Sequence, residues 1–255
     1  MGLGGLLRER AGDLRGILNG IDTSVWNRGT DPHIAARYDA GHLQNRIANK
    51  AALQQRLGLE ANPGAFLLGV ISRMSWQKGL DLLLDDVPII ASEGMQLVVL
   101  GTGDTDLQEM YRAAVHANPG KIGVVIGYDE SLAHLIQAGA DAVVVPSRFE
   151  PCGLTQLCAL RYGAVPIVSS VGGLEDTVTD DADVIGGESK TGFKFSPVTT
   201  HNLTRTLRRA HATFRDKAAW RRIQQNGMST DVSWRDRATR YADLYHEIVG
   251  QRPTS

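Results

Sequence analysis

The feature that most constrains the fold is a regular alternation of short apolar runs and longer helical stretches between residues 65 and 168. The runs lack the apolar–polar alternation of a half-exposed strand, so we interpret them as strands buried on both faces. This order of elements predicts right-handed crossovers and a parallel sheet with helices on both faces, which is an α/β, Rossmann-like, doubly wound fold. The predicted strands are residues 65–71, 96–100, 122–126, 141–145 and 165–168, and the helices between them are residues 80–92, 105–118, 130–138 and 153–162.

The flanks of this region are less regular. Residues 16–22 have the pattern of a strand end followed by a tight turn, and residues 42–57 predict a polar helix that stops at Gly58. After residue 168 the pattern loosens and predicts three helices, over residues 203–214, 217–225 and 234–249.

Composition excludes several classes of protein. The chain has 255 residues, of which 42% are hydrophobic and 22% charged, as expected of a soluble globular protein. With a net charge of only −1, the chain as a whole has no electrostatic attraction for nucleic acid or an anionic membrane. No apolar run approaches the roughly 20 residues that span a bilayer. Two cysteines predict a reducing compartment rather than a disulfide scaffold. The histidines lack metal-binding spacing, so we expect no metal site.

Charge is distributed unevenly along the chain. Residues 201–255 carry eleven Lys and Arg against five Asp and Glu, a net charge of +6, whereas the remainder has a net charge of −7. Two interpretations stay open: a solvated helical tail packed on an acidic body, or a basic face for an anionic ligand or a partner domain.

Ligands of a doubly wound sheet bind at the carboxyl ends of its strands, where five loops of this sequence are expected to meet. Arg73 and Lys78 lie on one loop just before a helix and suit a phosphate, unless they are ordinary surface cations. Gly153 and Thr155 open another helix whose free N–H groups can hold a diphosphate. Glu150 can pair with Lys78, bind a sugar hydroxyl, or be a plain charge at the helix start or on the surface.

The other loop residues give weaker signals. Gly172 and Gly173 offer backbone N–H groups to an anion or a sugar hydroxyl, or form a plain turn. Tyr128 is placed either to stack on a base or to pack locally. Cys152 has no neighbouring histidine in the sequence and is a poor candidate for a nucleophile. There is no P-loop, no full dinucleotide fingerprint and no Gly-x-Ser-x-Gly elbow. The loops at the strand ends instead predict a phosphate-rich site, for which a nucleotide or nucleotide sugar fits best.

Four segments resemble those of bacterial glycogen synthases and plant starch synthases, in the order and spacing of that family. They are GILNGIDTSVWN (16–27), SRMSWQKGLD (72–81), PSRFEPCGLTQL (146–157) and GGLEDTV (172–178), and Val232 to Trp234 also fit. The resemblance covers nearly the whole chain. It implies one half of a GT-B fold and the transfer of glucose from ADP-glucose to an α-1,4-glucan, with retention of configuration and without a cofactor.

The resemblance also implies roles for individual residues. Arg73 and Lys78 match the pair that binds the donor diphosphate and stabilises the leaving group, and Glu150 matches the carboxylate that faces the donor sugar. Tyr128 matches the residue that stacks on adenine. Many related transferases have a second Glu where this chain has Cys158. Gly153, Leu154 and Thr155 match the backbone cradle for the distal phosphate, and Cys152 matches a position beside the sugar. Gly172 and Gly173 complete the expected donor-binding positions.

One departure from the family concerns domain organisation. These synthases begin with a domain that carries a Lys-x-Gly-Gly-Leu loop, which this sequence lacks, because residues 171–174 have no lysine. We therefore expect residues 1–27 to be a remnant and linker from that N-terminal domain and residues 28–232 to be the donor-nucleotide domain. Residues 233–255 are then a C-terminal helix that crosses back to the N-terminal domain. A chain without that domain is expected to be inactive alone.

Two other functions remain open from the sequence. The chain can be a non-catalytic module that binds ADP or an ADP-sugar, or part of another GT-B transferase that uses a UDP-sugar. The expected partners are ADP-glucose or ADP, and an α-1,4-glucan that is bound mainly by the absent domain, with no nucleic acid and no membrane. The implied location is the bacterial cytoplasm, or a plastid for a plant protein.

Overall fold

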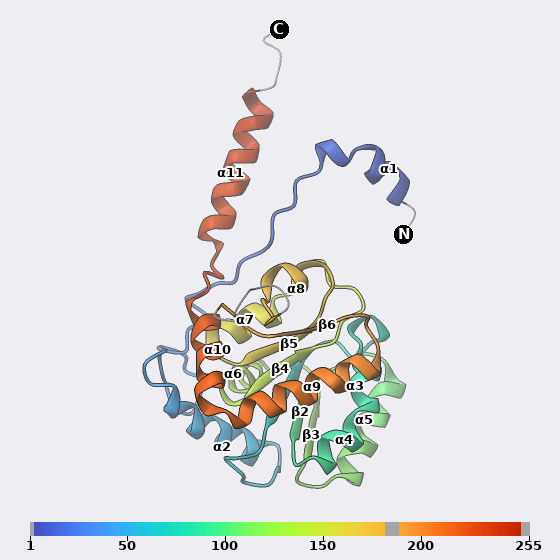
Figure 1. The fold of residues 1–255 in the computed structure, drawn as a ribbon, viewed down its shortest axis with the longest axis vertical. Coiled ribbons are helices and arrows are strands. Elements are labelled where there is room, and N and C mark those ends of the chain that lie inside the picture. The colour runs from blue at the N-terminus through green and yellow to red at the C-terminus, as the bar shows by residue number, and fades with distance from the viewer. Residues whose placement is uncertain (1–2, 182–188, 251–255) are drawn as a thin grey trace.

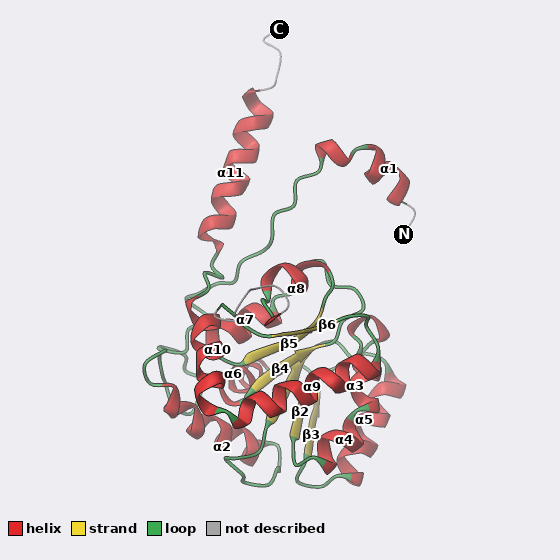
Figure 2. Ribbon diagram, in the orientation of Figure 1, coloured by secondary structure: helices red, strands yellow, loops and turns green. Residues whose placement is uncertain are grey.

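The structure, a computed structural model, describes residues 3–181 and 189–250. Its centre is a six-stranded parallel sheet of order β3-β2-β1-β4-β5-β6, with helices on both faces (Figure 2). The chain leaves β1 toward one edge and returns at β4 on the other side of β1, which is the strand reversal of a doubly wound sheet. The predicted α/β fold is thus confirmed. The strands are β1 (Leu67–Ile71), β2 (Gln96–Gly101), β3 (Ile122–Ile126), β4 (Ala142–Val145), β5 (Val165–Ser169) and β6 (Phe193–Phe195).

Two groups of helices cover the sheet. Buried side chains of α3, α4, α5, α9 and α10 pack on one face, and those of α2 and α6 pack on the other, where α7 and α8 also lie. The helices are α1 (Gly4–Glu9), α2 (Arg46–Arg56), α3 (Leu80–Asp85), α4 (Val87–Ser92), α5 (Thr105–Ala117), α6 (Glu130–Gly139), α7 (Thr155–Tyr162), α8 (Gly172–Thr177), α9 (Thr200–Arg215), α10 (Lys217–Ser229) and α11 (Trp234–Gly250).

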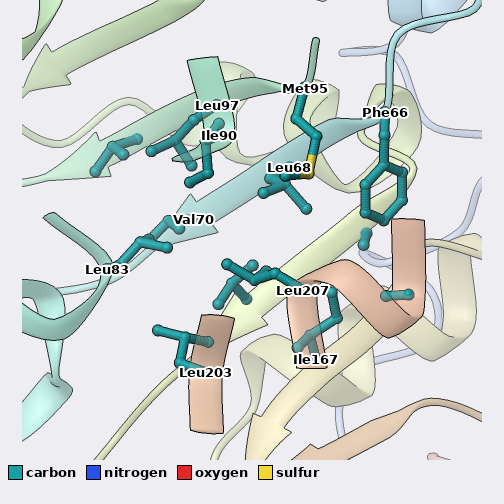
Figure 3. Close-up of a cluster of buried hydrophobic side chains, with 14 of the residues drawn as sticks. Phe66, Leu68, Val70, Leu83, Ile90, Met95, Leu97, Ile167, Leu203 and Leu207 are labelled. Atoms are coloured by element: carbon teal, nitrogen blue, oxygen red, sulfur yellow. The ribbon is translucent and has the colours of Figure 1, made fainter. Parts of the chain in front are cut away.

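The larger hydrophobic core lies on the α3–α4–α9 face of the sheet. Figure 3 shows Leu68 and Val70 of β1 among side chains of β2, α3, α4 and α9. The side chains of β1 alternate between the faces, because Leu67 belongs to the core on the α2–α6 side. Each fully buried leucine stabilises the fold by about 1.5–3 kcal/mol. This close packing holds the carboxyl ends of the strands, and therefore their loops, at fixed positions.

Two elements differ from the sequence expectation. The single helix expected over residues 80–92 is two helices, α3 and α4, which meet at Asp86. Pro88 accounts for the break, because it has no N–H group to donate to the carbonyl four residues earlier. The structure also adds β6, which pairs with β5 at the sheet edge and was not expected.

The two chain ends extend from the same side of the body (Figure 1). Neither α1 nor α11 contains a buried residue, and Arg15 contacts Glu247 at 3.2 Å. The strand end expected over residues 16–22 is a parallel bridge between Ile21 and Ser233, which ties the two segments together where they leave the body. Within residues 3–181 and 189–250, no helix is long and apolar enough to cross a membrane.

Candidate functional site

Three adjoining cavities line the carboxyl edge of the sheet, and we call them together the edge groove. The ionic cavity, of about 220 Å³, contains Arg73, Lys78 and Glu150. The tyrosine cavity, of about 200 Å³, contains Arg73 and Tyr128. The tryptophan cavity, of about 380 Å³, contains Tyr128 and is lined by both Trp26 and Trp234. All three share Ile71, the last residue of β1, so the groove begins where β1 ends.

Glycines allow the loop after β1 to pack closely against the loops after β2 and β4. Met74 is fully buried and forms a bridge with Gly103 of the loop after β2. Gly79 has a φ of +67°, and a Cβ atom there would lie 2.0 Å from the carbonyl oxygen of Pro146. Only glycine combines this backbone conformation with such close contact. The loop therefore holds Lys78 directly against the loop after β4.

Lys78 and Glu150 form an ion pair across these two loops. The Nζ atom of Lys78 lies 2.5 Å from Oε2 of Glu150, which also accepts a hydrogen bond from Ser147 Oγ at 3.2 Å. Their side chains are only 18% and 11% exposed, so the charges are poorly screened by water. An ammonium group has three donors, and Glu150 occupies one of those on Lys78. The others remain available to an anion in the ionic cavity.

Arg148 supports this arrangement, although no sequence pattern singled it out. Its guanidinium donates to both carboxylate oxygens of Asp81 at 2.7 Å and stacks 4.6 Å from the ring centroid of Trp76. Hydrogen bonding to Arg148 lowers the pKa of Asp81. Bidentate Arg–carboxylate pairs fix geometry more strongly than single contacts. Arg148, which lies on the loop of Glu150, thus holds that loop against Asp81 in the first turn of α3, directly after the loop of Lys78. Arg148 and Asp81 are 67 positions apart in the sequence.

The start of α7 forms the floor between the ionic and tryptophan cavities. Leu154 and Thr155 line the groove, and no side chain caps the first turn of α7. The first N–H groups of a helix have no partner within it and favour an anion. Gly153, with a φ of +74°, turns the chain into this helix. Phosphate oxygens in the ionic cavity would therefore meet α7 opposite Lys78 and Arg73.

Four of the predicted site residues do not line the groove. Gly173 donates its N–H group to the carbonyls of Glu150 and Pro151 at 3.2 Å, and a Cβ atom on Gly172 would lie 2.2 Å from the Glu150 carbonyl oxygen. Both glycines thus pack on the Glu150 loop. Cys152 accepts a hydrogen bond from the N–H group of Asn19 at 3.3 Å. The fourth residue is Gly153, which precedes the part of the loop that faces the groove.

Tyr128 stands at the rim of the groove. Its side chain is 86% exposed and lines both the tyrosine and the tryptophan cavity. The hydroxyl donates to Glu130 at 3.2 Å, and the charge of Glu130 raises the pKa of the tyrosine. Asp129 caps α6 by accepting from the N–H group of Leu132, which fixes the loop that carries Tyr128. A ring this exposed buries little area within the chain and is free to stack on a flat ligand.

The tryptophan cavity contains Gln137, which no sequence pattern singled out, beside Trp26 and Cys158. Gln137 is buried and donates from Nε2 to the carbonyl of Thr155 at 3.1 Å, whereas its Oε1 atom has no partner among the described residues. Trp26 stacks on buried His134 with ring centroids 4.0 Å apart. Cys158 also lines this cavity, and burial raises its pKa to about 12, so it is a thiol at neutral pH. These residues come from distant segments, and only the three-dimensional fold brings them together in one cavity.

Metal ligation finds no support in this arrangement. Within the described ranges, 3–181 and 189–250, no group of three or more His, Cys, Asp or Glu side chains is placed to hold a metal ion. The charged residues of the ionic cavity are two cations and one paired carboxylate, a set suited to an anionic ligand.

Comparison with known proteins gives a consistent result. The family model described as glycosyl transferases group 1 matches residues 54–222. Glycogen synthase 2 of Bradyrhizobium diazoefficiens is 66% identical over 252 residues, which make up 99% of this chain and 52% of that protein. A glycogen synthase of Rhodopseudomonas palustris is 58% identical, again over 99% of this chain and 52% of its own length. The chain therefore spans about half the length of the curated relatives it matches.

Solved structures agree with these relatives. The catalytic domain of starch synthase IV from Arabidopsis thaliana, bound to ADP and acarbose, superposes with a TM-score of 0.92 at 37% identity, over 98% of this chain and 52% of that chain. The Anabaena protein HepE in complex with UDP-glucose superposes with a TM-score of 0.66 at 19% identity, over 91% of this chain and 57% of that chain, and shares the fold alone.

Proposed function

The chain belongs to the glycosyl transferases group 1 family, and from this premise we propose that it is the donor-nucleotide half of a glycogen synthase. The complete enzyme would transfer glucose from ADP-glucose to an α-1,4-glucan. One observation carries the proposal: a single groove runs from an exposed aromatic ring, Tyr128, to the two cations Arg73 and Lys78 and the start of α7. The order of an aromatic ring followed by two cations matches a base followed by a diphosphate.

In this proposal the donor lies along the edge groove. Adenine stacks on Tyr128, and the diphosphate lies between Arg73, Lys78 and the first turn of α7. The glucose then faces Glu150, whose carboxylate Lys78 holds in place. The relatives named above support adenine as the base, since the starch synthase was solved with ADP.

We propose that catalysis is electrostatic. Negative charge builds on the diphosphate as the anomeric C–O bond breaks, and fixed cations and helix N–H groups are worth a few kcal/mol each against that charge. Lys78 is held by its ion pair with Glu150 before any ligand arrives, and α7 packs on the sheet, whereas Arg73 is an exposed side chain at the rim of the ionic cavity. Cys158 is a buried thiol, and Glu150 is engaged with Lys78, so neither is suited to attack the sugar. Retention then follows from attack on the same face of the sugar, with the departing diphosphate assisting the acceptor's proton.

The proposal assigns the acceptor mainly to the part of such an enzyme that this chain does not cover, since its relatives are almost twice as long. We propose that residues 1–27 and 233–255 join residues 28–232 to that part. Neither α1 nor α11 buries a side chain on the body, which supports this division. Glucan elongation is accordingly expected only when both halves are present.

Calorimetric titration of the chain with ADP and with UDP tests donor binding directly. We expect saturable binding that prefers ADP. Tighter binding of UDP would instead favour a transferase that uses another nucleotide sugar. Absence of binding for both nucleotides would contradict the proposal that this chain holds the donor site by itself.

A second experiment separates an enzyme half from a binding module. The chain is mixed with the separately produced N-terminal half of a close relative, and incorporation of glucose from ADP-glucose into glycogen is measured. Elongation that needs both halves and is lost in Glu150→Gln supports the synthase. ADP binding without elongation in a complex of both halves supports a binding module.

A further inference from the structure

A separate cavity lies at the amino ends of the strands, on the opposite side of the sheet from the edge groove at their carboxyl ends. This basic cavity, of about 280 Å³, is formed mainly by α2, the end of α9 and the first turns of α10. It includes Asp141, the residue directly before β4, so it lies at the amino ends of the strands. It shares no lining residue with the edge groove. Its lining residues are Leu43, Gln44, Arg46, Ile47, Lys50, Pro63, Gly139, Asp141, Phe214, Lys217, Trp220, Arg221 and Gln224.

Two of its four cations are fully engaged within the fold. Arg46 donates to the carbonyls of four residues around the end of α6 and the end of α7, from Gln137 to Gly163. Lys50 pairs with Asp141 at 2.7 Å and also donates to the carbonyls of Pro63 and Ala65. Because Asp141 is the one carboxylate of the lining, its charge is already matched. Lys50 and Arg46 therefore serve the structure rather than a ligand.

The other two cations, Lys217 and Arg221, are not matched. Among residues 3–181 and 189–250, no carboxylate lies within ion-pair distance of either. They are four positions apart in the first two turns of α10, where like charges repel each other and the positive end of the helix dipole. The Lys217 ammonium rests 3.3 Å from the ring centroid of Phe214. Burial is the main cause that lowers the pKa of Lys217; the charge of Asp141 opposes this shift and that of Lys50 adds to it. An anion between the two side chains would relieve the repulsion between their charges.

The rest of the lining limits the kind of anion. The cavity volume, about 280 Å³, lies just below the roughly 300–1,000 Å³ of pockets that hold drug-sized ligands. We therefore expect a small ligand. Phe214 and Ile47 offer apolar surface to a carbon skeleton. Gln44 offers an amide to hydroxyl groups, and Gln224, whose Nε2 atom donates to the carbonyl of Gly163, offers its amide oxygen. Buried Trp220 also lines the cavity, and its Nε1 donor has no acceptor among the described residues. A guanidinium and an ammonium together suit a phosphate dianion.

We propose that the basic cavity binds a small phosphate monoester, such as a sugar phosphate, between Lys217 and Arg221. The phosphate contacts the two cations, and the sugar lies against Phe214 and the amides. The net charge of +6 over residues 201–255 includes both cations. Of the two sequence interpretations of that charge, the proposal favours a basic face for an anionic ligand. Because the edge groove is at the other end of the strands, occupancy by ADP leaves this site open.

Titration of the chain with glucose 6-phosphate, in the presence of saturating ADP, tests the proposal. ADP fills the edge groove, so that the phosphate ester cannot bind there. We expect saturable binding with a dissociation constant of about 1 mM or below. Inorganic phosphate should bind more weakly, and glucose not measurably. Lack of saturable binding by the wild-type chain, or equal binding of glucose, would overturn the proposal.

Matched variants locate the binding on the chain. Arg221→Ala and Lys217→Ala should each weaken glucose 6-phosphate binding about tenfold, the effect of losing one charged hydrogen bond. Arg222→Ala is the control, because it removes the same charge from the next position of α10 without lining the cavity. Exposed substitutions of this kind change folding little, which thermal unfolding verifies. An Arg222→Ala loss equal to that of Arg221→Ala would overturn the site in favour of diffuse surface attraction.

Discussion

Lys78 and Glu150 are joined by a 2.5 Å ion pair that connects the loop after β1 to the loop after β4. Each side chain is largely withdrawn from water, so each depends on the other for neutralisation. The same pair fixes a cation where the diphosphate is proposed to lie and a carboxylate where the sugar is proposed to lie. Donor binding and local stability are therefore coupled at this contact.

Lys78→Ala should weaken ADP binding by about 10- to 100-fold, because a charge-assisted hydrogen bond to a phosphate contributes about 1.5–3 kcal/mol. It should also lower the free energy of unfolding by about 1–3 kcal/mol, since the carboxylate of Glu150 is left without its cation. Calorimetry with ADP and urea unfolding measure the two effects.

The double variant Lys78→Ala/Glu150→Gln separates these two effects. It removes the unpaired charge and should recover most of the lost stability while ADP binding stays weak. Recovery of ADP affinity in the double variant would mean that Lys78 acts only by neutralising Glu150 and does not contact the diphosphate.

Tyr128→Ala should weaken ADP binding by about 1–3 kcal/mol, the range found for stacking of a base on an aromatic ring. Stability should change by less than about 0.5 kcal/mol, because the ring is 86% exposed. Pyrophosphate binding should be unaffected, since it lacks the base. Tyr128→Phe keeps the ring and is the control. Equal losses for ADP and pyrophosphate would contradict stacking.

The sheet could be predicted from the sequence because its strands are buried on both faces. Val98, Val143 and Ile167 lie within continuous apolar runs, and each run appears as a strand in the structure. Loops that follow parallel strands must meet at one edge, so the contact between Lys78 and Glu150 could be named as one option. Sequence alone could not choose between this ion pair and a bond from Glu150 to a sugar hydroxyl, because that choice depends on loop geometry.

Other features depended on contacts that a single sequence does not encode. The three-residue strand β6 is too short to show a periodic pattern, and it is held by pairing with β5. The Arg148–Asp81 pair joins distant loops. Pro88 pointed to a break near Asp86, but the apolar periodicity on both sides of it favoured a single helix. The tryptophan cavity combines Trp26 with Gln137, which only the folded chain brings together.

Gly79→Ala should destabilise the chain more than Gly94→Ala does. Both glycines have a positive φ, of +67° and +74°, so both substitutions carry a backbone cost of about 1 kcal/mol. At Gly94 nothing lies within 4 Å of a new Cβ atom, whereas at Gly79 the carbonyl oxygen of Pro146 would be 2.0 Å away. Urea unfolding should show an additional loss of about 1–3 kcal/mol for Gly79→Ala, with weaker ADP binding because the loop of Lys78 moves. Equal losses for the two variants would show that the β1 loop is free to move away from Pro146.

Asp86→Asn should change how stability depends on pH. Asp86 is fully buried, accepts a hydrogen bond from Thr204 and has a second carboxylate oxygen without a partner among the described residues. Burial is the main cause that raises its pKa from 3.8 to about 6. Between these values the folded chain holds a proton that the unfolded chain has released, so stability falls as pH rises through this window. Above the window the ionised carboxylate costs about 1–3 kcal/mol.

In the Asp86→Asn variant this loss should disappear, because the amide carries no charge at any pH. The variant should therefore be more stable than the wild type above about pH 7 and close to it near about pH 4, as measured by urea unfolding across that range. Asp85→Asn is the matched comparison: the charge of exposed Asp85 adds to the rise in the pKa of Asp86, so this variant should reduce the slope without abolishing it. If Asp86→Asn were less stable than the wild type at every pH, the ionised carboxylate would be a stabilising partner of Thr204 and the sign of the argument would be reversed.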